Sequence, residues 1–418
     1  MKMKVKYFLV LFLLLIFSAF ALPDGVKVSA GTAKSSADAE DIKKRVIENC
    51  GLDPYWTAYM AVYGYVYGDY LYFYKSAEAE RDIYRIRIKD YKLEEYVSDV
   101  FTPEFVDDFV FYNDKDYILY AKKLNTGKTI KLASDGWSGQ VRLYKERIYY
   151  IDNYRLYTIK TDGSDKKLIA SKVDGGLYNL DLIFIYKDHV FYMNDYYEKN
   201  SKFIIGKKIY RCDLDGSNRK CIKKVKVSMG RAGLMIRNGK LLIAYYDENI
   251  DHSIKNEPLD YNALYIYKGK KFKKLGASDD YPQYDVRRTE GYVYRAGNIK
   301  NGKPDYEEFS NKIIREDKKG IWTVFGSLPY AFDPMDLGFE MQNGYLVVYV
   351  DWGGDEVDRI MVYDKMGNIM ADVEIAGRTD ECWMYAAVVG DCVYIIHHSY
   401  MYSNSVHRNI DKCEVIEM

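Results

Sequence analysis

Acidic side chains gather in one short stretch of the sequence, DWGGDEVD, at residues 351–358. It offers the carboxylates of Asp351, Asp355, Glu356 and Asp358 beside two glycines. Carboxylate oxygens on a glycine-containing loop are ligands that suit Ca²⁺. The spacing D-x-[DN]-x-[DN]-G of a calcium loop is not met, so a solvated loop without an ion is the favoured reading and Ca²⁺ the weaker one.

Other signatures of catalysis are sparse. His397 and His398 are neighbours in an alternating run, so in a strand their side chains point to opposite faces and cannot chelate one ion together. The sequence has no G-x-S-x-G nucleophile elbow, and no Walker loop or GxGxxG opens a helix. We therefore predict no catalytic residue and no cofactor. Paired carboxylates for glycoside chemistry cannot be picked out among 61 acids, so that chemistry stays open.

Aromatic residues offer binding chemistry instead, because the chain holds 44 tyrosines in 418 residues. Several lie beside Asp and Asn in the longer polar stretches from residue 195 onward. These candidate ligand-binding residues are Tyr196, Tyr197, Tyr261, Tyr306, Trp352, Tyr400 and Tyr402. Aromatic anchors with polar neighbours suit a face that binds sugars or peptides. The alternative is that these tyrosines only pack loops onto the sheets.

A repeat organises the chain around these stretches. An apolar run, a two-residue polar turn and a run rich in Tyr and Val recur roughly every 40 to 50 residues. The turns fall near Asp69, Asp108, Glu146, Asp188, Gly239, Gly291, Gly344 and Asp391. A second hairpin marked by Asp-Gly, Lys-Gly or Met-Gly-Asn usually follows. Each repeat thus predicts four antiparallel strands, as in one blade of an all-β propeller.

We count eight such units, so eight blades are preferred and seven remain possible. The last unit ends after one strand, NIDKCEVIEM, so an N-terminal strand could complete it. A two-sheet sandwich would not need eight repeats. We assign the propeller to residues 55–418. In a propeller the first strands line the central channel, which makes four charged residues there candidates for a polar ligand or for salt bridges: Arg142, Asp181, Asp285 and Arg287.

The N-terminus reads as a secretory signal peptide and its cleavage region over residues 1–30. Lys2, Lys4 and Lys6 precede the apolar run YFLVLFLLLIFSAFA, and small residues allow cleavage after Ala21 or Ala30. An uncleaved anchor is the alternative. We expect a secreted or cell-envelope-associated protein, without a membrane span after cleavage. Equal numbers of basic and acidic residues, 61 each, give no electrostatic footprint for nucleic acid.

A short helix is predicted in the segment 31–54. In SSADAEDIKKRVIENCG, Ser35 is a candidate N-cap and Gly51 a stop signal. Ile42, Val46 and Ile47 then lie on one face. A frayed linker is the alternative.

Six cysteines in an exported chain permit disulfides. If Gly216 and Ser217 form a two-residue turn, Cys212 faces Cys221 as a non-hydrogen-bonded pair, about 4.5 Å apart between Cα atoms, which predicts a bridge. Two reduced thiols are the alternative. The same counting separates Cys382 from Cys392. A bridge between Cys50 and Cys413, near the two chain ends, stays open.

The hairpins KIYRCDLDGSNRKCI and LYTIKTDGSDKKLI resemble the YWTD-type propeller repeat of low-density-lipoprotein-receptor-related proteins, and the chain resembles bacterial secreted propellers of unknown function. The YWTD tetrapeptide itself is absent; YYID at Tyr149–Asp152 and FYMN at Phe191–Asn194 stand in its place. Six blades and flanking cysteine-rich modules, usual in the relatives, are not evident. The resemblance implies a fold and a binding role, and transfers no catalytic residue.

These observations favour a non-enzymatic binding or scaffold protein. We expect a monomer that recognises a protein or carbohydrate at the cell envelope through its long loops, since short loops hold a scaffold and long ones carry function. The alternative is a polysaccharide lyase or glycoside hydrolase with acids over the central channel.

Overall fold

The computed structural model describes residues 36–77, 80–133, 138–173, 183–197, 204–226, 232–237, 240–245, 262–274, 292–305, 310–317, 319–332, 337–350, 358–375, 382–403 and 406–418. These residues form antiparallel β-sheets and two helices. The chain divides into two compact units. Unit 1 comprises Met1–Gly31, Phe101–Asp251 and Leu259–Asp285; unit 2 comprises Thr32–Val100, His252–Pro258 and Val286–Met418. No helix among the described residues is long and apolar enough to cross a membrane.

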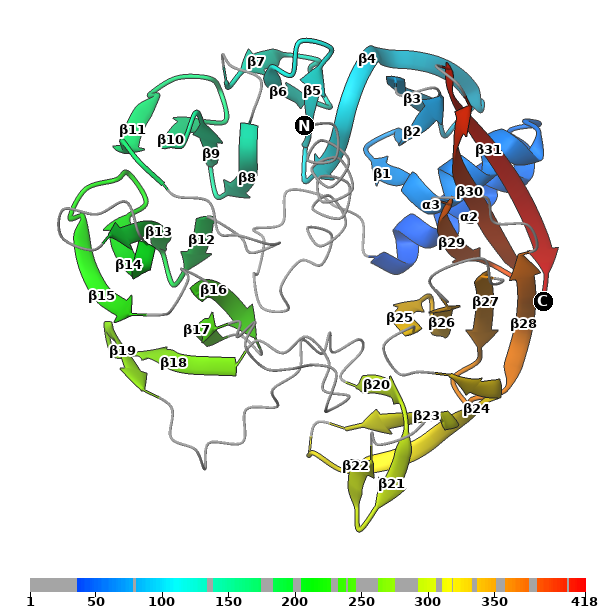
Figure 1. Ribbon diagram of the computed structural model, residues 1–418. Helices are drawn as coiled ribbons and strands as arrows, with labels where there is room; N and C mark the ends of the chain where they lie inside the picture. Colours follow the sequence, from blue (N-terminus) through cyan, green and yellow to red (C-terminus); the bar gives the residue numbers. More distant parts are fainter. Residues whose placement is uncertain are drawn as a thin grey trace. The chain divides into compact units, whose positions relative to one another are not determined.

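Unit 1 holds three complete four-stranded sheets, each with its strands in chain order. The first contains β8 (Ser138–Tyr144), β9 (Arg147–Asp152), β10 (Arg155–Lys160) and β11 (Lys167–Ala170). The second contains β12 (Ile183–Tyr186), β13 (His189–Tyr197), β14 (Ile204–Asp213) and β15 (Lys220–Lys226). The third contains β16 (Ala232–Arg237), β17 (Lys240–Tyr245), β18 (Asn262–Lys268) and β19 (Lys271–Lys274). Figure 1 shows that β15 and β19 are the outermost strands of their sheets.

A seven-stranded sheet spans the boundary between the units along the chain. It contains β1 (Tyr65–Tyr67), β2 (Tyr70–Ala77), β3 (Glu80–Arg87), β4 (Lys92–Val106), β5 (Phe109–Asp114), β6 (Leu119–Lys123) and β7 (Thr129–Lys131). The long strand β4 ends the first predicted unit and begins the second, which is why two repeats share one sheet.

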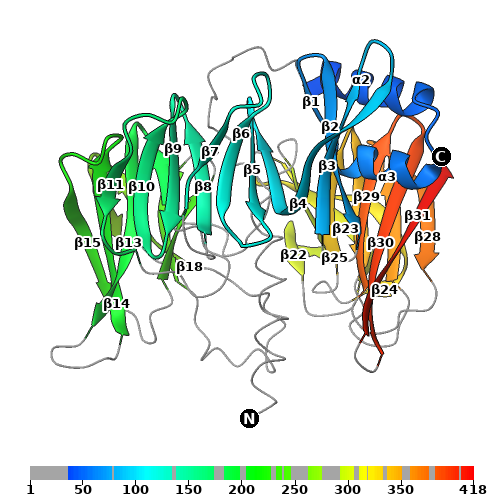
Figure 2. The same ribbon diagram turned by 90° about the horizontal axis from the view of Figure 1, so that it is seen from above.

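Unit 2 holds the remaining sheets. β25 (Leu337–Gln342), β26 (Tyr345–Val350), β27 (Asp358–Tyr363) and β28 (Ile369–Ile375) form a four-stranded sheet. β20 (Val293–Ala296), β23 (Ser310–Glu316) and β24 (Trp322–Phe332) form a three-stranded one, and β21 (Asn298–Lys300) and β22 (Lys303–Asp305) a separate hairpin. β29 (Cys382–Val389), β30 (Cys392–Ser403) and β31 (Val406–Glu417) form the last sheet. Figure 2 shows β30 and β31 extending past the neighbouring strands as a long hairpin.

The predicted two-residue turns near Asp69, Asp108, Glu146, Asp188, Gly344 and Asp391, whose residues are described, are confirmed, and the turn near Gly239 lies outside the described residues. Lys187 and Asp188 both have positive φ, 49° and 59°, between the paired residues Tyr186 and His189. This is the type I′ turn, whose twist matches that of the flanking strands. The turn near Gly291 lies outside the described residues.

The second hairpins of the first two four-stranded sheets in unit 1 have three-residue turns, whereas that of the β16–β19 sheet has two residues between the paired Lys268 and Lys271. Lys160 N donates to Ser164 O at 2.9 Å and Gly163 N to Lys160 O at 2.8 Å, which leaves three residues in the loop. Gly163 has a φ of +86°, as a type I turn followed by a bulge requires. Asp162 Oδ1 accepts a hydrogen bond from Ser164 N at 2.7 Å. The Asp162 side chain therefore stabilises the turn.

Stacked tyrosine pairs recur across the second and third strands of successive sheets. Tyr150 on β9 lies opposite Tyr157 on β10, with ring centroids 5.6 Å apart. Tyr192 on β13 lies opposite Tyr210 on β14, with centroids 5.3 Å apart. A cation from each outer hairpin, Lys166 or Arg219, lies over both rings. Cross-strand aromatic pairs stabilise sheets, so much of the tyrosine content serves the fold.

The N-terminal helix is confirmed as α2 (Ser36–Asn49), whose predicted apolar face, Ile42, Val46 and Ile47, is buried. A second helix, α3 (Pro54–Tyr63), was not predicted. It lies at the start of the segment 55–418 that we assigned to the propeller. Asp53 caps α3 by accepting a hydrogen bond from Trp56 N at 3.1 Å.

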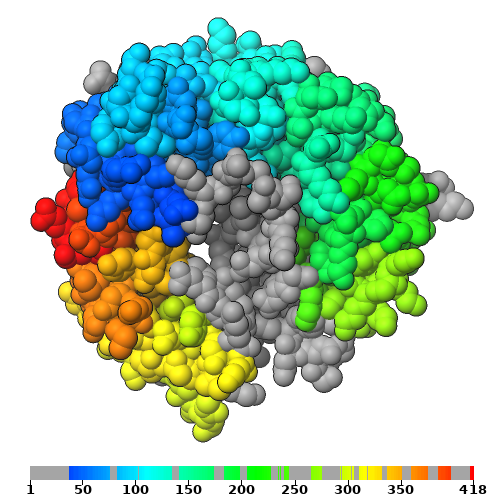
Figure 3. Space-filling model, turned by 180° about the vertical axis from the view of Figure 1, so that it is seen from behind, coloured from blue at the N-terminus to red at the C-terminus, as the bar shows by residue number. Residues whose placement is uncertain are grey.

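The last sheet is not completed by an N-terminal strand in the described part of the chain, as the sequence reading had allowed. Residues 36–63 supply α2 and α3 instead. One core joins α2 and α3 to Leu71 and Phe73 of β2 and to Tyr394 and Ile396 of β30. The N-terminal helices lie against the C-terminal strands (Figure 3).

Candidate functional site

Of the eleven residues predicted to bind a ligand, three have described side chains: Arg142, Tyr196 and Tyr197. Outside the described residues lie Asp181, Tyr261, Asp285, Arg287, Tyr306 and Trp352. Tyr400 and Tyr402 belong to β30, opposite Asn409 and His407, and so are not in a loop as predicted. The cause is local: β30 and β31 continue pairing up to Ser403 and Val406, so the expected long loop is a hairpin.

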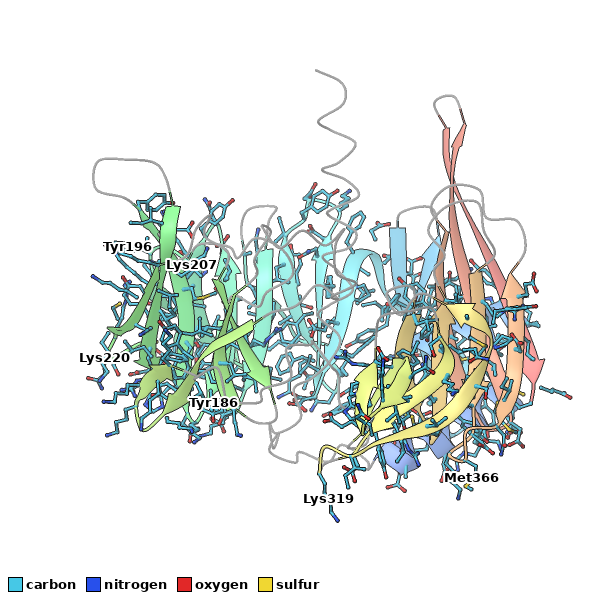
Figure 4. All side chains as sticks on the ribbon, turned by 60° about the horizontal axis from the view of Figure 1, so that its bottom comes forward. Tyr186, Tyr196, Lys207, Lys220, Lys319 and Met366 are labelled. Carbon is cyan, nitrogen blue, oxygen red and sulfur yellow. The ribbon has the colours of Figure 1, made fainter. Side chains whose placement is uncertain are left out.

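Tyr196 and Tyr197 also lie in a strand, at the end of β13, where a loop was expected. Tyr196 pairs with Gly206 and Tyr197 with Ile204, and the register shifts between the two pairs. A Cβ atom at Gly206 would lie 1.9 Å from Val225 O, so only glycine fits there. Such an irregularity re-aims a side chain at a strand end. Figure 4 shows Tyr196 and Lys207 at the same end of this sheet, far from Tyr186.

Both tyrosines are accompanied by lysines. Tyr197 is 39% exposed, and Lys172 Nζ lies 5.1 Å from its ring centroid and 3.5 Å from its hydroxyl. Lys208 Nζ and Lys224 Nζ lie 4.9 and 5.7 Å from the Tyr196 ring centroid. Cations held over aromatic faces are attracted by the ring quadrupole. We call these five residues, Lys172, Tyr196, Tyr197, Lys208 and Lys224, the tyrosine–lysine platform.

A buried ion pair underlies this end of the sheet. Lys207 Nζ contacts Asp195 Oδ1, and the two side chains are only 2% and 10% exposed. Lys207 lies two residues from Ile209 on β14 and shares its face, and Ile209 is part of the core between this sheet and the β16–β19 sheet. Removing two charges from water is costly, so each partner depends on the other. The pair fixes β13 to β14 immediately beside Tyr196.

Two buried polar atoms lie on the other face of β13. Tyr192 Oη and Asn194 Oδ1 have no hydrogen-bond partner among the described residues. They alternate with Asp195 and share a strand face with Tyr196. A buried acceptor or donor left unpaired costs about 1–3 kcal/mol, so these atoms have an affinity for water or for a polar ligand group.

Two kinds of connection lie close together at this end of the sheet. Lys172 belongs to the segment that follows β11 and leads to the next sheet, whereas Tyr196 and Tyr197 end a second strand. The contact between Lys172 and Tyr197 brings these two connections together in this sheet. The four lysines around the tyrosines, residues 172, 207, 208 and 224, were missed. The abundance of lysine in β14 and β15 was the available signal.

Arg142 does not join the platform's contacts. It lies half-buried on β8, opposite Tyr149, and its Nη1 donates to Val141 O at 2.8 Å.

The predicted Cys212–Cys221 disulfide is wrong. The turn holds three residues, with Asp213 N bonded to Ser217 O at 2.9 Å and Gly216 at a φ of +85°. The longer turn and a further shift place Cys221 opposite Tyr210. Both thiols are free, Cys212 buried and Cys221 exposed.

The other cysteine predictions can be followed along the strands. Cys382 lies opposite Ser399 and Cys392 opposite Val389, so these two are far apart along the hairpin, as predicted. Cys50 is free, which excludes the bridge to Cys413 in this structure.

Two of the thiols, Cys212 and Cys392, are not activated for nucleophilic attack. Burial raises the pKa of Cys212 to about 12. Burial, and then the nearby carboxylates of Glu417 and Asp391, raise the pKa of Cys392. A thiol with a raised pKa is protonated at neutral pH and reacts poorly. Cys392 lines a cavity of about 340 Å³ between α2 and the last sheet, together with Lys44, Glu48 and Tyr394.

No group of three or more His, Cys, Asp or Glu side chains suited to a metal ion occurs among the residues that the structure describes. Of the calcium candidates, Asp351 and Asp355 lie outside those residues, as does Glu356, and Asp358 begins β27.

Comparison with known proteins gives only distant likenesses. No family model matches the chain, and no curated protein matches it. The computationally designed Ika8 protein is 10% identical with a TM-score of 0.40, covering 85% of this chain and 96% of its own. An oligogalacturonate lyase in complex with manganese is 11% identical with a TM-score of 0.35, covering 70% and 85%. A nidogen/laminin complex is 13% identical with a TM-score of 0.24, covering 74% and 94%. Similarity at this level assigns no function to this chain.

Proposed function

We propose that this chain is a secreted, non-enzymatic binding module that recognises a protein or a glycan at the cell envelope. The fold we propose for it is a β-propeller of the YWTD-like kind, with eight blades preferred and seven as the alternative. The repeated four-stranded antiparallel sheets, each in chain order, support a blade architecture.

The observation that carries the proposal is the tyrosine–lysine platform. Tyr197 presents a partly exposed ring, and the lysines beside it orient both rings from three different elements. Rigid aromatic side chains contribute large contact area at low entropic cost, and cationic neighbours add polar contacts. The buried Asp195–Lys207 pair supports the strand end that carries the tyrosines. Such a preorganised surface suits recognition, which needs no proton transfer.

The test is a binding screen with the purified full chain against a glycan array and a peptide library. We expect at least one probe to bind the wild-type chain. The Tyr196→Ser/Tyr197→Ser variant should bind that probe more than tenfold more weakly, because truncating an aromatic anchor costs about 2 kcal/mol or more.

The matched control is Tyr154→Ser/Tyr330→Ser. These tyrosines are 65% and 60% exposed, and Arg359 lies over Tyr330 as lysines do over the platform. This variant should bind like the wild type. Equal weakening in both variants, or no bound probe in the whole screen, would remove the proposal.

A further inference from the structure

The outer edge of two adjacent sheets in unit 1 is strongly basic. Residues 219–226, which include β15, carry five cations, and residues 262–274, which include β18 and β19, carry five more; neither segment contains Asp or Glu. The cations are Arg219, Lys220, Lys223, Lys224, Lys226, Lys268, Lys270, Lys271, Lys273 and Lys274. We call this set the lysine face. All of its members are exposed except Lys223, which is half-buried.

The lysine face comes from two neighbouring edge strands. β15 and β19 contact each other, and Figure 1 shows them side by side. Tyr265 of β18 joins them, since it lies opposite Lys274 in the ladder and Lys223 Nζ of β15 lies 4.0 Å from its ring centroid. The apolar residues between the lysines, Val225 and Phe272, are buried in the core shared by the two sheets. Their neighbours on each strand, Lys224 and Lys226 on β15 and Lys271 and Lys273 on β19, therefore point away from this core, on the far face of each sheet.

The positive charges of the lysine face are not neutralised by ion pairs among the described residues. Among the described residues, none of the ten cations forms an ion pair with a carboxylate. Other edge strands differ: Lys167 of β11 pairs with Asp165 at 3.6 Å, and β28 carries Asp372 and Glu374, both bound by Arg359.

Protection of an edge strand against aggregation does not explain why all ten charges of the lysine face are positive. Charges of either sign blunt an edge, and mixed charges would do so without mutual repulsion. The whole chain is neutral, so ten unpaired cations on adjacent strands are a local asymmetry. Like charges gathered on one surface repel each other and attract a polyanion.

We propose that the lysine face binds a linear acidic polysaccharide that carries a carboxylate on each sugar. Alternate residues of a strand are about 6.6 Å apart, so each strand presents a pair of cations at this spacing, Lys224 and Lys226 on β15 and Lys271 and Lys273 on β19. Nine of the ten cations are lysines, which act as point charges, whereas nucleic-acid recognition favours arginine. The rings of Tyr210 and Tyr265 are covered by cations and offer no open stacking platform for bases. No large apolar side chain of β15 or β19 is exposed, so a membrane anchor is missing here.

This inference does not rest on the proposed function, because the two surfaces use different residues. Figure 4 shows Lys220 toward the opposite end of the sheet from Tyr196. Lys224 alone belongs to both sets, so it is left unchanged in the test.

The experiment measures binding of the full chain to alginate oligomers across a series of salt concentrations, with dextran as the uncharged probe. The test variant is Lys220→Gln/Lys271→Gln/Lys273→Gln/Lys274→Gln. We expect the wild type to bind alginate and not dextran. The variant should bind alginate about tenfold more weakly or worse, with a salt dependence shallower by about 2 or more on a log–log plot. Replacing the same four lysines by Arg should preserve binding, and circular dichroism of each variant checks folding.

The matched control changes four exposed lysines on other strands and turns, Lys115, Lys131, Lys312 and Lys365, to Gln, and so alters the net charge equally. It should bind like the wild type. The proposal is overturned if this control loses as much affinity, or if the wild type binds dextran equally well. Tighter binding to duplex DNA, to an acidic peptide or to phosphatidylserine vesicles than to alginate, at equal charge concentration, would also overturn the polysaccharide assignment.

Discussion

Lys207 holds a charge almost completely inside the protein beside the tyrosines that we assign to binding. Its side chain is 2% exposed, and Asp195 compensates for its charge. A buried pair adds little net stability compared with two apolar residues, but a single remaining charge is strongly unfavourable. Stability measurements on variants of this pair therefore test whether it holds in place the strand end that carries the tyrosine–lysine platform.

Changing Lys207 to Ala should lower the free energy of unfolding by about 3–5 kcal/mol, because Asp195 is left buried and unpaired. The double variant Asp195→Leu/Lys207→Met should recover most of this loss. Lys208→Ala, on the neighbouring half-buried lysine, should change it by less than about 0.5 kcal/mol. Urea denaturation measures all three. A Lys207→Ala chain as stable as the wild type would contradict the buried ion pair.

The turn aspartates predict a pH dependence of stability. Hydrogen bonds from Ser164 and Ser217 lower the pKa values of Asp162 and Asp215, and hydrogen bonds from Asn368 lower that of Asp364. A lowered pKa in the folded state stabilises the fold above the ordinary value of 3.8 and ceases to do so as the pH falls through the folded-state value.

We therefore expect stability to decrease progressively as the pH is lowered below about 4. The variant Asp162→Asn/Asp215→Asn/Asp364→Asn keeps the side-chain acceptor of each turn but cannot titrate. Its unfolding temperature should fall less steeply than that of the wild type between pH 4 and pH 2. Parallel curves for the two chains would contradict this role of the aspartates.

At the scale of elements, α3 packs against both the N-terminal strand β2 and the C-terminal strand β30 in unit 2. Met60 of α3 is fully buried in the core that α2 and α3 share with β2 and β30. This core replaces the N-terminal strand that would otherwise complete the last sheet.

Truncating Met60 to Ala should cost about 2–5 kcal/mol of stability, because it leaves a cavity in this core. Met366 lies in the turn before β28, is 72% exposed and is labelled in Figure 4. Met366→Ala should change stability by less than about 0.5 kcal/mol. Thermal unfolding compares the two. Similar small effects of both substitutions would show that α3 does not hold this core together.

Local patterns in the sequence predicted most of the strands, because alternation and turn residues act over a few positions. The turn at Lys187–Asp188 is an example. α3 was missed because PYWTAYMAVY is apolar on all sides, and periodicity alone does not separate a buried helix from a strand. The disulfide failed because the choice between a two-residue and a three-residue turn shifts every later pair.

The site could be predicted only in part. Tyr196 and Tyr197 were identified by residue type, but their place in β13 depends on pairing with residues 204–206, across a connection that local patterns do not describe. The lysines beside them come from three other positions along the chain, and only the folded sheet brings them together.

For the molecule as a whole, composition concealed the charge distribution. A net charge of +0 argued against a basic surface, because it averages over the whole chain. The order of strands in unit 1 brings β15 and β19 together and gathers cations that are separate in the sequence. Binding is the function that we propose for both surfaces.

The most direct test of this account is equilibrium dialysis of the wild-type chain with each glycan or peptide that the screen finds, followed by analysis of the recovered probe. The account predicts saturable binding and a probe recovered intact. New reducing ends, unsaturated sugar ends or cleaved peptide bonds, formed in proportion to the amount of protein, would contradict the claim that the chain binds without catalysis.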